Sequence, residues 1–365
     1  MKIKHNKEIE NAIINLSRTM DENERKADIL NSYLGKKCNS AYEYAEKQYQ
    51  KGRPEKEAFL ASFKYLSIEN KPLLSSQDSL DAIRALNQEI FAKNPYYQTI
   101  HFLNKKKNSW ELRQSSYKPF QGFVCDEIII NEKDYFKETT PFGFFLEEFP
   151  YLEILENNKN WMSLTPHEIL TMNQSIQEAK GNVLTFGLGM GYYAFMASMK
   201  TDVKEVTIVE KDATAISLFC SFILPHFPNK QKIKIVQEDA FAFAKRPLNE
   251  TYDSIFVDIW HLPFDGLFLY LRFKNLFRNL TRPKISYWIE KSILALLRRA
   301  LIVLIEEEYQ GSNDENYLFS NNETDTLINS LHFLLKEKRI NCAADLMNLL
   351  KDDNLKGIAA NCLRQ

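Results

Sequence analysis

The chain has 365 residues, of which 44% are hydrophobic, 13% aromatic and 26% charged. This composition excludes an intrinsically disordered or collagen-like chain, and at roughly 150 residues per domain the length fits two or three domains. The balance of 47 Lys and Arg against 48 Asp and Glu gives a net charge of -1 and no overall attraction to nucleic acid, so a nucleic-acid partner is not expected. The five cysteines lie far apart, without the spacing of a zinc site or a disulfide framework, so we expect free thiols and no metal.

The sequence contains no segment typical of export or membrane insertion. Its first residues, MKIKHNKEIENAII, are too polar for a secretory signal. The most apolar later run, 285–305, is interrupted by charged residues that would be costly in a bilayer. We therefore expect a cytoplasmic protein without a membrane span, in which this run packs internally or, as the alternative, forms a homodimer interface.

Residues 1–95 are predicted to form a helical section. Apolar residues recur there at spacings of three and four, most regularly over 9–16 and 80–91. Residues 96–160 are predicted to form a small antiparallel β section, because short β-like runs alternate with polar turns. These runs lie at 99–103, 109–113 and 127–130.

Residues 161–310 are predicted to form an α/β domain. Thr165, Pro166 and Glu168 have the pattern of a capping box with proline at the first helical position, so a helix is expected from there to about residue 179. Strands are then expected at 183–186, 206–209, 233–236, 254–257 and 285–289. Their alternation with helical segments predicts a doubly wound, mostly parallel sheet. Residues 311–365 are predicted to form a helical C-terminal section.

A cluster of glycines directly follows the first of these strands. Gly187, Gly189 and Gly191 fall within five positions, although the chain has only 11 glycines in all. A tight turn between a strand and a helix allows a ligand to approach the backbone, and the helix N-terminus offers unpaired amides. A nucleotide-like ligand would fit there; the alternative is a structural turn without a ligand.

Two acidic residues follow the next two strands. Glu210 ends the second strand, 19 residues after Gly191, where a carboxylate can accept both hydroxyls of a ribose. Asp239 follows the third strand at the same edge of the sheet, where it can accept the exocyclic amine of adenine. The alternative is that both are solvated loop residues.

These segments resemble the cofactor half of class I S-adenosylmethionine-dependent methyltransferases, and among them the spermidine synthase-like branch. The resemblance is carried by VLTFGLGMG, VTIVEKD, VQEDAF and YDSIFVD, within residues 183–258. It implies a Rossmann-like methyltransferase sheet and S-adenosylmethionine as the cofactor. The residues implied to contact this cofactor are Gly187, Leu188, Gly189, Met190, Gly191, Glu210, Lys211, Asp239 and Ala240. A nicotinamide dinucleotide is less favoured, because Tyr192 stands where its usual motif has a third glycine.

The end of the fourth strand is the expected place for catalysis. Asp258 could orient an amine acceptor or attract a sulfonium, and His261 could take a proton near neutral pH. In aminopropyltransferase relatives an aspartate at this strand end helps to activate the amine, and Asp258 matches it in place. The alternatives are a capping role for Asp258 and an ordinary surface histidine. Residues 161–165 could also fold over the cofactor.

From these observations we expect an S-adenosylmethionine-dependent methyltransferase that acts on a small molecule or a protein group. The first alternative is an aminopropyltransferase-like enzyme, which would use decarboxylated S-adenosylmethionine and a polyamine. The second is a protein that binds the cofactor without catalysis. The first 95 residues contain no motif that we can interpret chemically.

Overall fold

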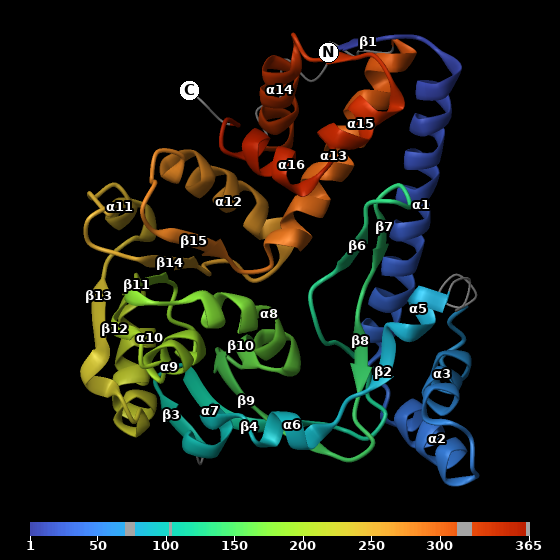
Figure 1. Ribbon diagram of the computed structural model, residues 1–365. Coiled ribbons are helices and arrows are strands. Elements are labelled where there is room, and N and C mark those ends of the chain that lie inside the picture. Colours follow the sequence, from blue (N-terminus) through green and yellow to red (C-terminus); the bar gives the residue numbers. More distant parts are fainter. Residues whose placement is uncertain (70–76, 102–103, 312–322, 363–365) are drawn as a thin grey trace.

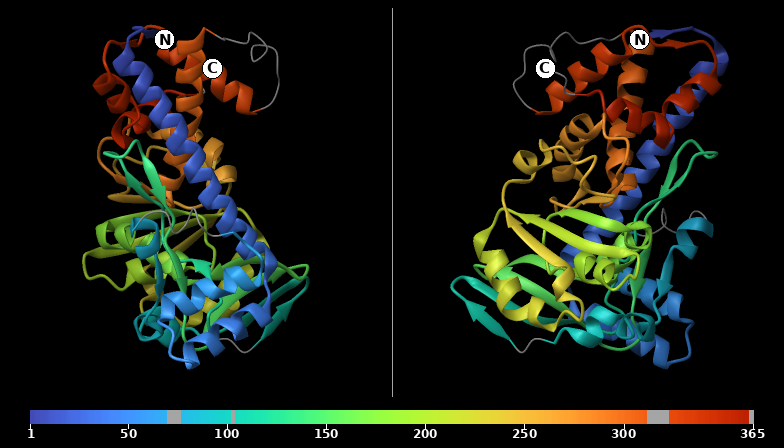
Figure 2. Two further views of the ribbon diagram at one scale, coloured as in Figure 1. Left: turned by 90° about the vertical axis from the view of Figure 1, so that its right-hand side faces the viewer. Right: turned by 60° about the vertical axis from the view of Figure 1, so that its left-hand side comes forward.

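The computed structural model describes residues 1–69, 77–101, 104–311 and 323–362. A parallel sheet flanked by helices lies at its centre, with an antiparallel sheet beside it (Figure 1). The long helix α1 (Lys7–Lys36) runs along one side and joins two helical groups, one near each of its ends (Figures 1 and 2).

The central sheet has five strands in the order β13-β12-β11-β14-β15, and every neighbouring pair is parallel. The strands are β11 (Gly181–Phe186), β12 (Val203–Glu210), β13 (Ile233–Gln237), β14 (Ser254–Val257) and β15 (Lys284–Tyr287). In the central strand β11, Val183, Leu184 and Phe186 are fully buried, as expected for a strand covered on both faces. The strand order reverses between β11 and β14, which confirms the predicted doubly wound, Rossmann-like α/β fold.

Helices cover both faces of this sheet. In Figure 1, α12 and α13 lie on one side, and α8, α9 and α10 lie on the other. The helices are α8 (Pro166–Glu178), α9 (Tyr192–Ser198), α10 (Ala213–Leu218), α11 (Ala240–Ala244), α12 (Pro263–Phe277) and α13 (Glu290–Gln310). Between α10 and β13 lie a π-helical turn (Phe219–Ile223) and two 3-10 turns (Leu224–His226 and Lys230–Lys232). The helices predicted before and after β11 are therefore present.

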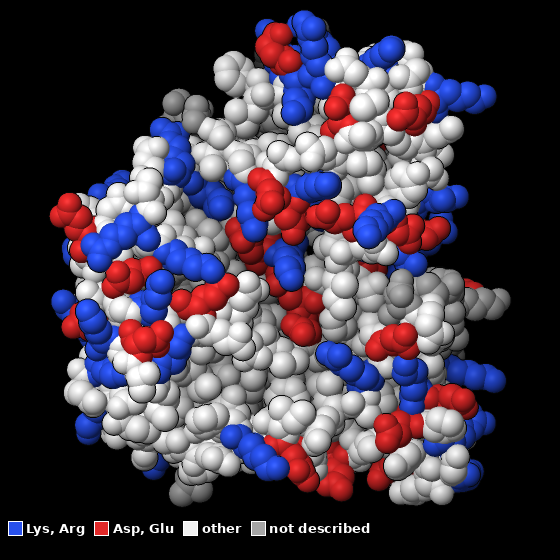
Figure 3. Space-filling model, viewed as in Figure 1, with Lys and Arg blue, Asp and Glu red and all other residues white. Residues whose placement is uncertain are grey.

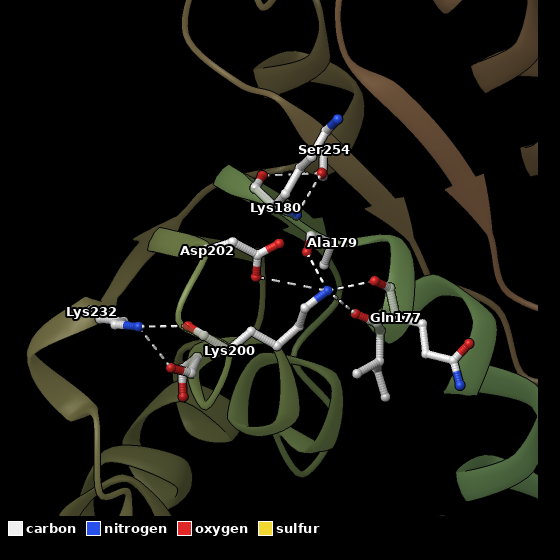
Figure 4. Close-up of polar contacts among 9 residues, drawn as sticks. Gln177, Ala179, Lys180, Lys200, Asp202, Lys232 and Ser254 are labelled. Atoms are coloured by element: carbon white, nitrogen blue, oxygen red, sulfur yellow. Dashed lines mark hydrogen bonds and ion pairs between the residues drawn. The ribbon is translucent and has the colours of Figure 1, made fainter.

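Two lysines anchor helix C-termini at the edge of the sheet opposite the carboxyl ends of its strands (Figure 4). The Lys200 ammonium donates hydrogen bonds to the carbonyls of Ile176, Gln177 and Ala179, which end α8. Lys232 does the same for α9, through the carbonyls of Ser198 and Lys200. A cation at a helix C-terminus satisfies unpaired carbonyls and opposes the helix dipole. These contacts fix α8 relative to the sheet.

An antiparallel sheet precedes the α/β core, with the strand order β10-β9-β4-β3. Its strands are β3 (Lys105–Lys107), β4 (Trp110–Tyr117), β9 (Phe149–Glu156) and β10 (Lys159–Leu164). The strand predicted at 99–103 is wrong throughout its described part: Asn94 caps a short helix, α7 (Pro95–Thr99), with Pro95 at the first position, and residues 100 and 101 have no regular structure. Residues 102–103 lie outside the described residues. Smaller pairings involve β5 (Phe123–Val124), β6 (Ile129–Asn131), β7 (Lys137–Thr139) and β8 (Phe142–Phe144).

The front section is helical, as predicted, but its second half is interrupted. Its helices are α1, α2 (Asn39–Gln50), α3 (Glu55–Tyr65), α5 (Gln77–Asp81) and α6 (Gln88–Ala92). The continuous helical pattern read over 80–91 is wrong, because β2 (Ile83–Ala85) separates α5 from α6 and pairs with β8. A separate aromatic core forms where α1, α3 and β8 meet, and includes Tyr33, Phe59 and Phe142.

The C-terminal section packs against α1, α12 and α13. Its elements are α14 (Glu323–Leu335), β16 (Arg339–Ile340), α15 (Ala343–Leu349) and α16 (Asp352–Ala359). Strand β16 pairs in parallel with β1 (Lys2–Ile3), so the beginning of the chain is bound to this section. Acidic and basic side chains are interspersed near the middle of the face shown in Figure 3. Ion pairs that link α16 to α13 include Arg298–Asp352 and Lys356–Glu290.

No helix in the described ranges is long and apolar enough to cross a bilayer.

Candidate active site

A pocket of about 910 Å³ opens at the carboxyl ends of the parallel strands. Residues that follow β11, β12, β13, β14 and β15 all contribute to its lining, and β10 supplies one wall. In open α/β sheets this edge, beside the reversal of strand order, is where ligands bind. The acidic residues of the lining are Glu168, Glu210, Glu238, Asp239 and Asp258, and the lysine and arginine residues are Lys211 and Arg272.

The glycine loop forms the pocket wall after β11. Gly187 has φ +97, and a Cβ at this position would lie 1.8 Å from the backbone oxygen of Asp258. Gly189 has φ +50, and its Cβ would lie 2.5 Å from the sulfur of Met162. A larger residue would therefore displace the end of β14 or the opposite wall. Leu188 also lines the pocket, whereas Met190 is buried and neither it nor Gly191 is part of the lining.

Glu210 connects the second strand to the glycine loop. One oxygen of its carboxylate accepts a hydrogen bond from the Leu188 amide (3.2 Å), and the other accepts one from the Asp212 amide (2.9 Å). Each carboxylate oxygen has a second lone pair, so the same group can still accept hydroxyls from the pocket. The adjacent Lys211 lines the pocket as well.

Asp239 caps the helix that follows the third strand. Its carboxylate accepts a hydrogen bond from the Ala242 amide (3.0 Å) at the start of α11, and the residue is exposed at the pocket rim. Ala240 lies beside it in the lining. On the neighbouring wall, the Arg272 guanidinium stacks 3.9 Å above the centre of the Phe241 ring.

Asp258 stands at the end of β14, and its backbone amide donates to the carbonyl of Phe186 (2.9 Å). Desolvation raises the pKa of its carboxyl group to about 7. No hydrogen bond or ion pair to this carboxyl group occurs among the described residues. His261 lies at the exposed rim, where its backbone amide donates to Asp265 (3.0 Å).

Glu168 is a pocket residue that the sequence interpretation missed. The capping box predicted for Thr165 and Glu168 is wrong: within the described chain, Thr165 makes no side-chain cap hydrogen bond. Glu168 instead lines the pocket, where burial, and after it the charge of Asp258, holds the pKa of its carboxyl group well above the usual range. The local sequence gives no signal for this role, because Thr165 and Glu168 have the spacing that is typical of a capping box.

Aromatic and thioether side chains form the remaining walls. Trp161 and Met162 come from β10, which places the segment before α8 in the pocket lining. Trp260 donates its indole N–H to the carbonyl of Trp288 (3.3 Å), and Trp288 donates to the Thr171 hydroxyl of α8 (2.9 Å). Two indoles are thereby held in fixed orientations beside the carboxyl groups.

The fold and the pocket together define the class of the protein: it has the fold of S-adenosylmethionine-dependent methyltransferases and their relatives, with an acidic pocket at the ligand edge of the sheet. Residues 167–307 match the sequence model of the spermine/spermidine synthase domain. This segment contains the glycine loop, Glu210, Asp239, Asp258 and Glu168. The pocket-forming part of the chain is thus similar to a spermidine synthase-like transferase.

Three solved structures are similar over part of the chain. Spermidine synthase from Thermotoga maritima shows 12% identity and a TM-score of 0.29, over 38% of this chain and 53% of its own. A spermidine synthase in complex with the transition state analogue AdoDATO shows 13% identity and a TM-score of 0.30, over 38% of this chain and 54% of its own. A probable spermidine synthase from Corynebacterium glutamicum ATCC 13032 shows 18% identity and a TM-score of 0.27, over 34% of this chain and 50% of its own. Each match therefore spans about half the length of the other protein. None of the curated proteins matches the sequence significantly.

The domain match corrects two expectations from the sequence. The methyltransferase activity is wrong, because the matched domain is that of the aminopropyl-transferring branch. S-adenosylmethionine as the cofactor is wrong for the same reason: this family uses the decarboxylated compound, as a substrate. The expectation of a transferase is confirmed. The match favours the first alternative from the sequence, an aminopropyltransferase-like enzyme.

Proposed function

We propose that the protein transfers an aminopropyl group from decarboxylated S-adenosylmethionine to a small amine. The observation that carries the proposal is Asp258, a carboxyl group without a protein partner among the described residues, in the same pocket as the glycine loop. An unpaired carboxylate is costly in a desolvated site unless a ligand supplies a cation or a proton occupies it. An alkylammonium supplies that cation.

The chemistry requires a base close to the acceptor. The nitrogen lone pair attacks the carbon bonded to the sulfonium sulfur, the carbon–sulfur bond breaks, and its electron pair remains on a neutral thioether. An alkylamine has a pKa near that of lysine, about 10.4, so it arrives protonated and must first lose a proton. With a pKa of about 7, Asp258 is suited to accept it near neutral pH.

The donor half of the pocket suits a nucleoside. We propose that Glu210 accepts the ribose hydroxyls, that Asp239 accepts the adenine amine, and that the backbone of Gly187, Leu188 and Gly189 contacts the sulfonium side of the donor. The excess of acidic over basic groups in the lining supports a donor that carries a sulfonium and an ammonium but no carboxylate.

We propose that the division of the chain at about residues 95, 160 and 310 reflects function, with the two front sections forming the acceptor side. Asn160, at the end of the second front section in β10, lines the pocket and supports this arrangement. Residues 312–322, at the last boundary, lie outside the described residues. A cytoplasmic location, a homodimer and the lack of a nucleic-acid partner stay predictions.

The direct test is formation of methylthioadenosine, measured by liquid chromatography, from decarboxylated S-adenosylmethionine and a panel of amines. The panel should contain putrescine, spermidine and simple monoamines. We expect product with at least one amine, and a fall of about 100-fold or more in kcat/KM for Asp258→Asn, which keeps the shape of the side chain but not the base. Donor binding without product for any amine would instead support the non-catalytic alternative.

A further inference from the structure

Two helices beside the pocket begin with the same local pattern but use their acidic residue differently. Both α8 and α12 have proline at the first position and an acid two residues later, Glu168 and Asp265. The Asp265 carboxylate accepts hydrogen bonds from the backbone amides of His261 (3.0 Å) and Leu262 (2.6 Å), and so caps its own helix. Glu168 makes no such bond within the described residues.

The Glu168 carboxyl group therefore lies away from the amides that an acid at this position usually binds. It lines the pocket together with Asp258, and the two groups interact electrostatically. Neither group has a hydrogen bond or an ion pair in the described part of the chain. Two unpaired carboxyl groups in one pocket are unusual, because each has lost water without gaining a protein partner.

Among the described residues, no lysine or arginine is one of the charges that shift the pKa of Glu168 or Asp258. Burial lowers the pKa of the neighbouring His167 to about 4, so this imidazole is neutral at pH 7. Tyr117 of β4 interacts electrostatically with Glu168, and burial raises the pKa of its hydroxyl, which is therefore neutral as well. The Arg272 guanidinium stacks on Phe241. The other titratable groups of the lining are Glu210, Lys211, Glu238, Asp239 and His261.

Two carboxyl groups that interact in a desolvated pocket resist double ionisation unless a cation lies between them, because their negative charges repel each other. We infer that Glu168 and Asp258 act as one unit, which holds a single proton in the free protein and binds the ammonium of the acceptor between its two carboxyl groups. This inference rests on the proposed function for the identity of the bound cation, but not for the existence of the pair.

As a member of this pair, Glu168 takes part in the aminopropyl transfer. When the acceptor enters as an ammonium, the proton held by the pair leaves to water, and the ammonium is bound by two carboxylates. One carboxylate then takes a proton from the nitrogen, which frees the lone pair for attack on carbon. The carbon–sulfur bond breaks with its electrons on sulfur, and the proton later returns to water. The aromatic wall of Trp260 and Trp288 limits access of water during these steps.

The existence of the pair can be tested without any substrate. Protein with ¹³C-labelled Asp and Glu carboxyl groups is titrated by NMR between pH 4 and 10 as wild type, Glu168→Gln, Asp258→Asn and Glu238→Gln. We expect two coupled protonation steps in the wild type. In Glu168→Gln and in Asp258→Asn we expect a single protonation step, at a lower pH than the upper step of the wild type. The matched control Glu238→Gln removes a pocket acid that is already paired with Arg246 (2.6 Å), and should retain both steps.

Activity provides the second readout. We expect Glu168→Gln to lower kcat/KM for the amine by about 10- to 100-fold and to shift its pH profile, while Glu205→Gln, at an exposed acid outside the pocket lining, keeps the profile of the wild type. An upper step that persists unchanged in Asp258→Asn would overturn the inference, whatever the activity. If the two coupled steps are observed but no methylthioadenosine forms, the pair exists and the proposed function is wrong.

Discussion

At the scale of single residues, Glu210 has both a structural and a proposed binding role. Its carboxylate accepts the Leu188 amide of the glycine loop, and so fixes the loop against the end of β12. A glutamine could accept one of its two amide hydrogen bonds but not hold the negative charge. Loss of a charge-assisted hydrogen bond to a ligand costs about 1.5 to 3 kcal/mol.

We therefore expect Glu210→Gln to weaken donor binding by about 1.5 to 3 kcal/mol, measured by calorimetric titration with decarboxylated S-adenosylmethionine. The control is Glu205→Gln, an exposed acid on the same strand and outside the pocket lining. Equal donor affinities for the two folded variants would show that Glu210 only supports the loop.

At the scale of secondary-structure elements, the position of α8 decides where Glu168 lies. Lys200 binds three carbonyls at the C-terminal end of this helix, opposite the end that carries Glu168 (Figure 4). We expect Lys200→Met to lower the free energy of unfolding by about 1 to 2 kcal/mol in urea denaturation, since three carbonyls lose their donor. Lys230→Met, at an exposed lysine without a side-chain hydrogen bond in the described chain, should change it by less than about 0.5 kcal/mol. Similar losses in both variants would contradict this role for Lys200.

The elements also show which predictions a single sequence supports. The parallel strands were predictable because short apolar runs such as Val183–Phe186 are buried on both faces, and the glycines after β11 indicate the loop. Strand β2 was not predictable, because the strand with which it pairs, β8, lies far along the chain. Glu168 has a local pattern that fits a capping box, and its actual environment depends on the end of β14, 90 residues later. A local pattern can indicate only local hydrogen bonds. It cannot predict a side chain such as Glu168, whose environment is formed by residues far away in the sequence.

At the scale of the whole molecule, the raised pKa of Asp258 makes the free energy of unfolding depend on pH. Its pKa is about 7 in the folded protein against 3.8 for the unperturbed group, so the folded state binds the proton more tightly. The stabilisation from this proton is fully present below about pH 4 and is lost as the pH rises through 7.

We therefore expect the wild type to lose about 3 to 4 kcal/mol of stability relative to Asp258→Asn between pH 4 and 8, since each pKa unit corresponds to about 1.4 kcal/mol. Urea denaturation of both proteins across this range gives the difference directly. A difference that does not change with pH would mean that the Asp258 carboxyl group is solvated and has an ordinary pKa.

We propose that the pocket at the carboxyl edge of the sheet binds a decarboxylated sulfonium donor. The most direct measurement is calorimetric titration of the purified protein with decarboxylated S-adenosylmethionine, beside intact S-adenosylmethionine and NAD. We predict micromolar affinity for the decarboxylated compound and binding at least about 10-fold weaker for the other two, because the acidic pocket repels the carboxylate of intact S-adenosylmethionine and the diphosphate of NAD. Equal or tighter binding of the intact compound, or no binding of either, would show that decarboxylated S-adenosylmethionine is not the donor.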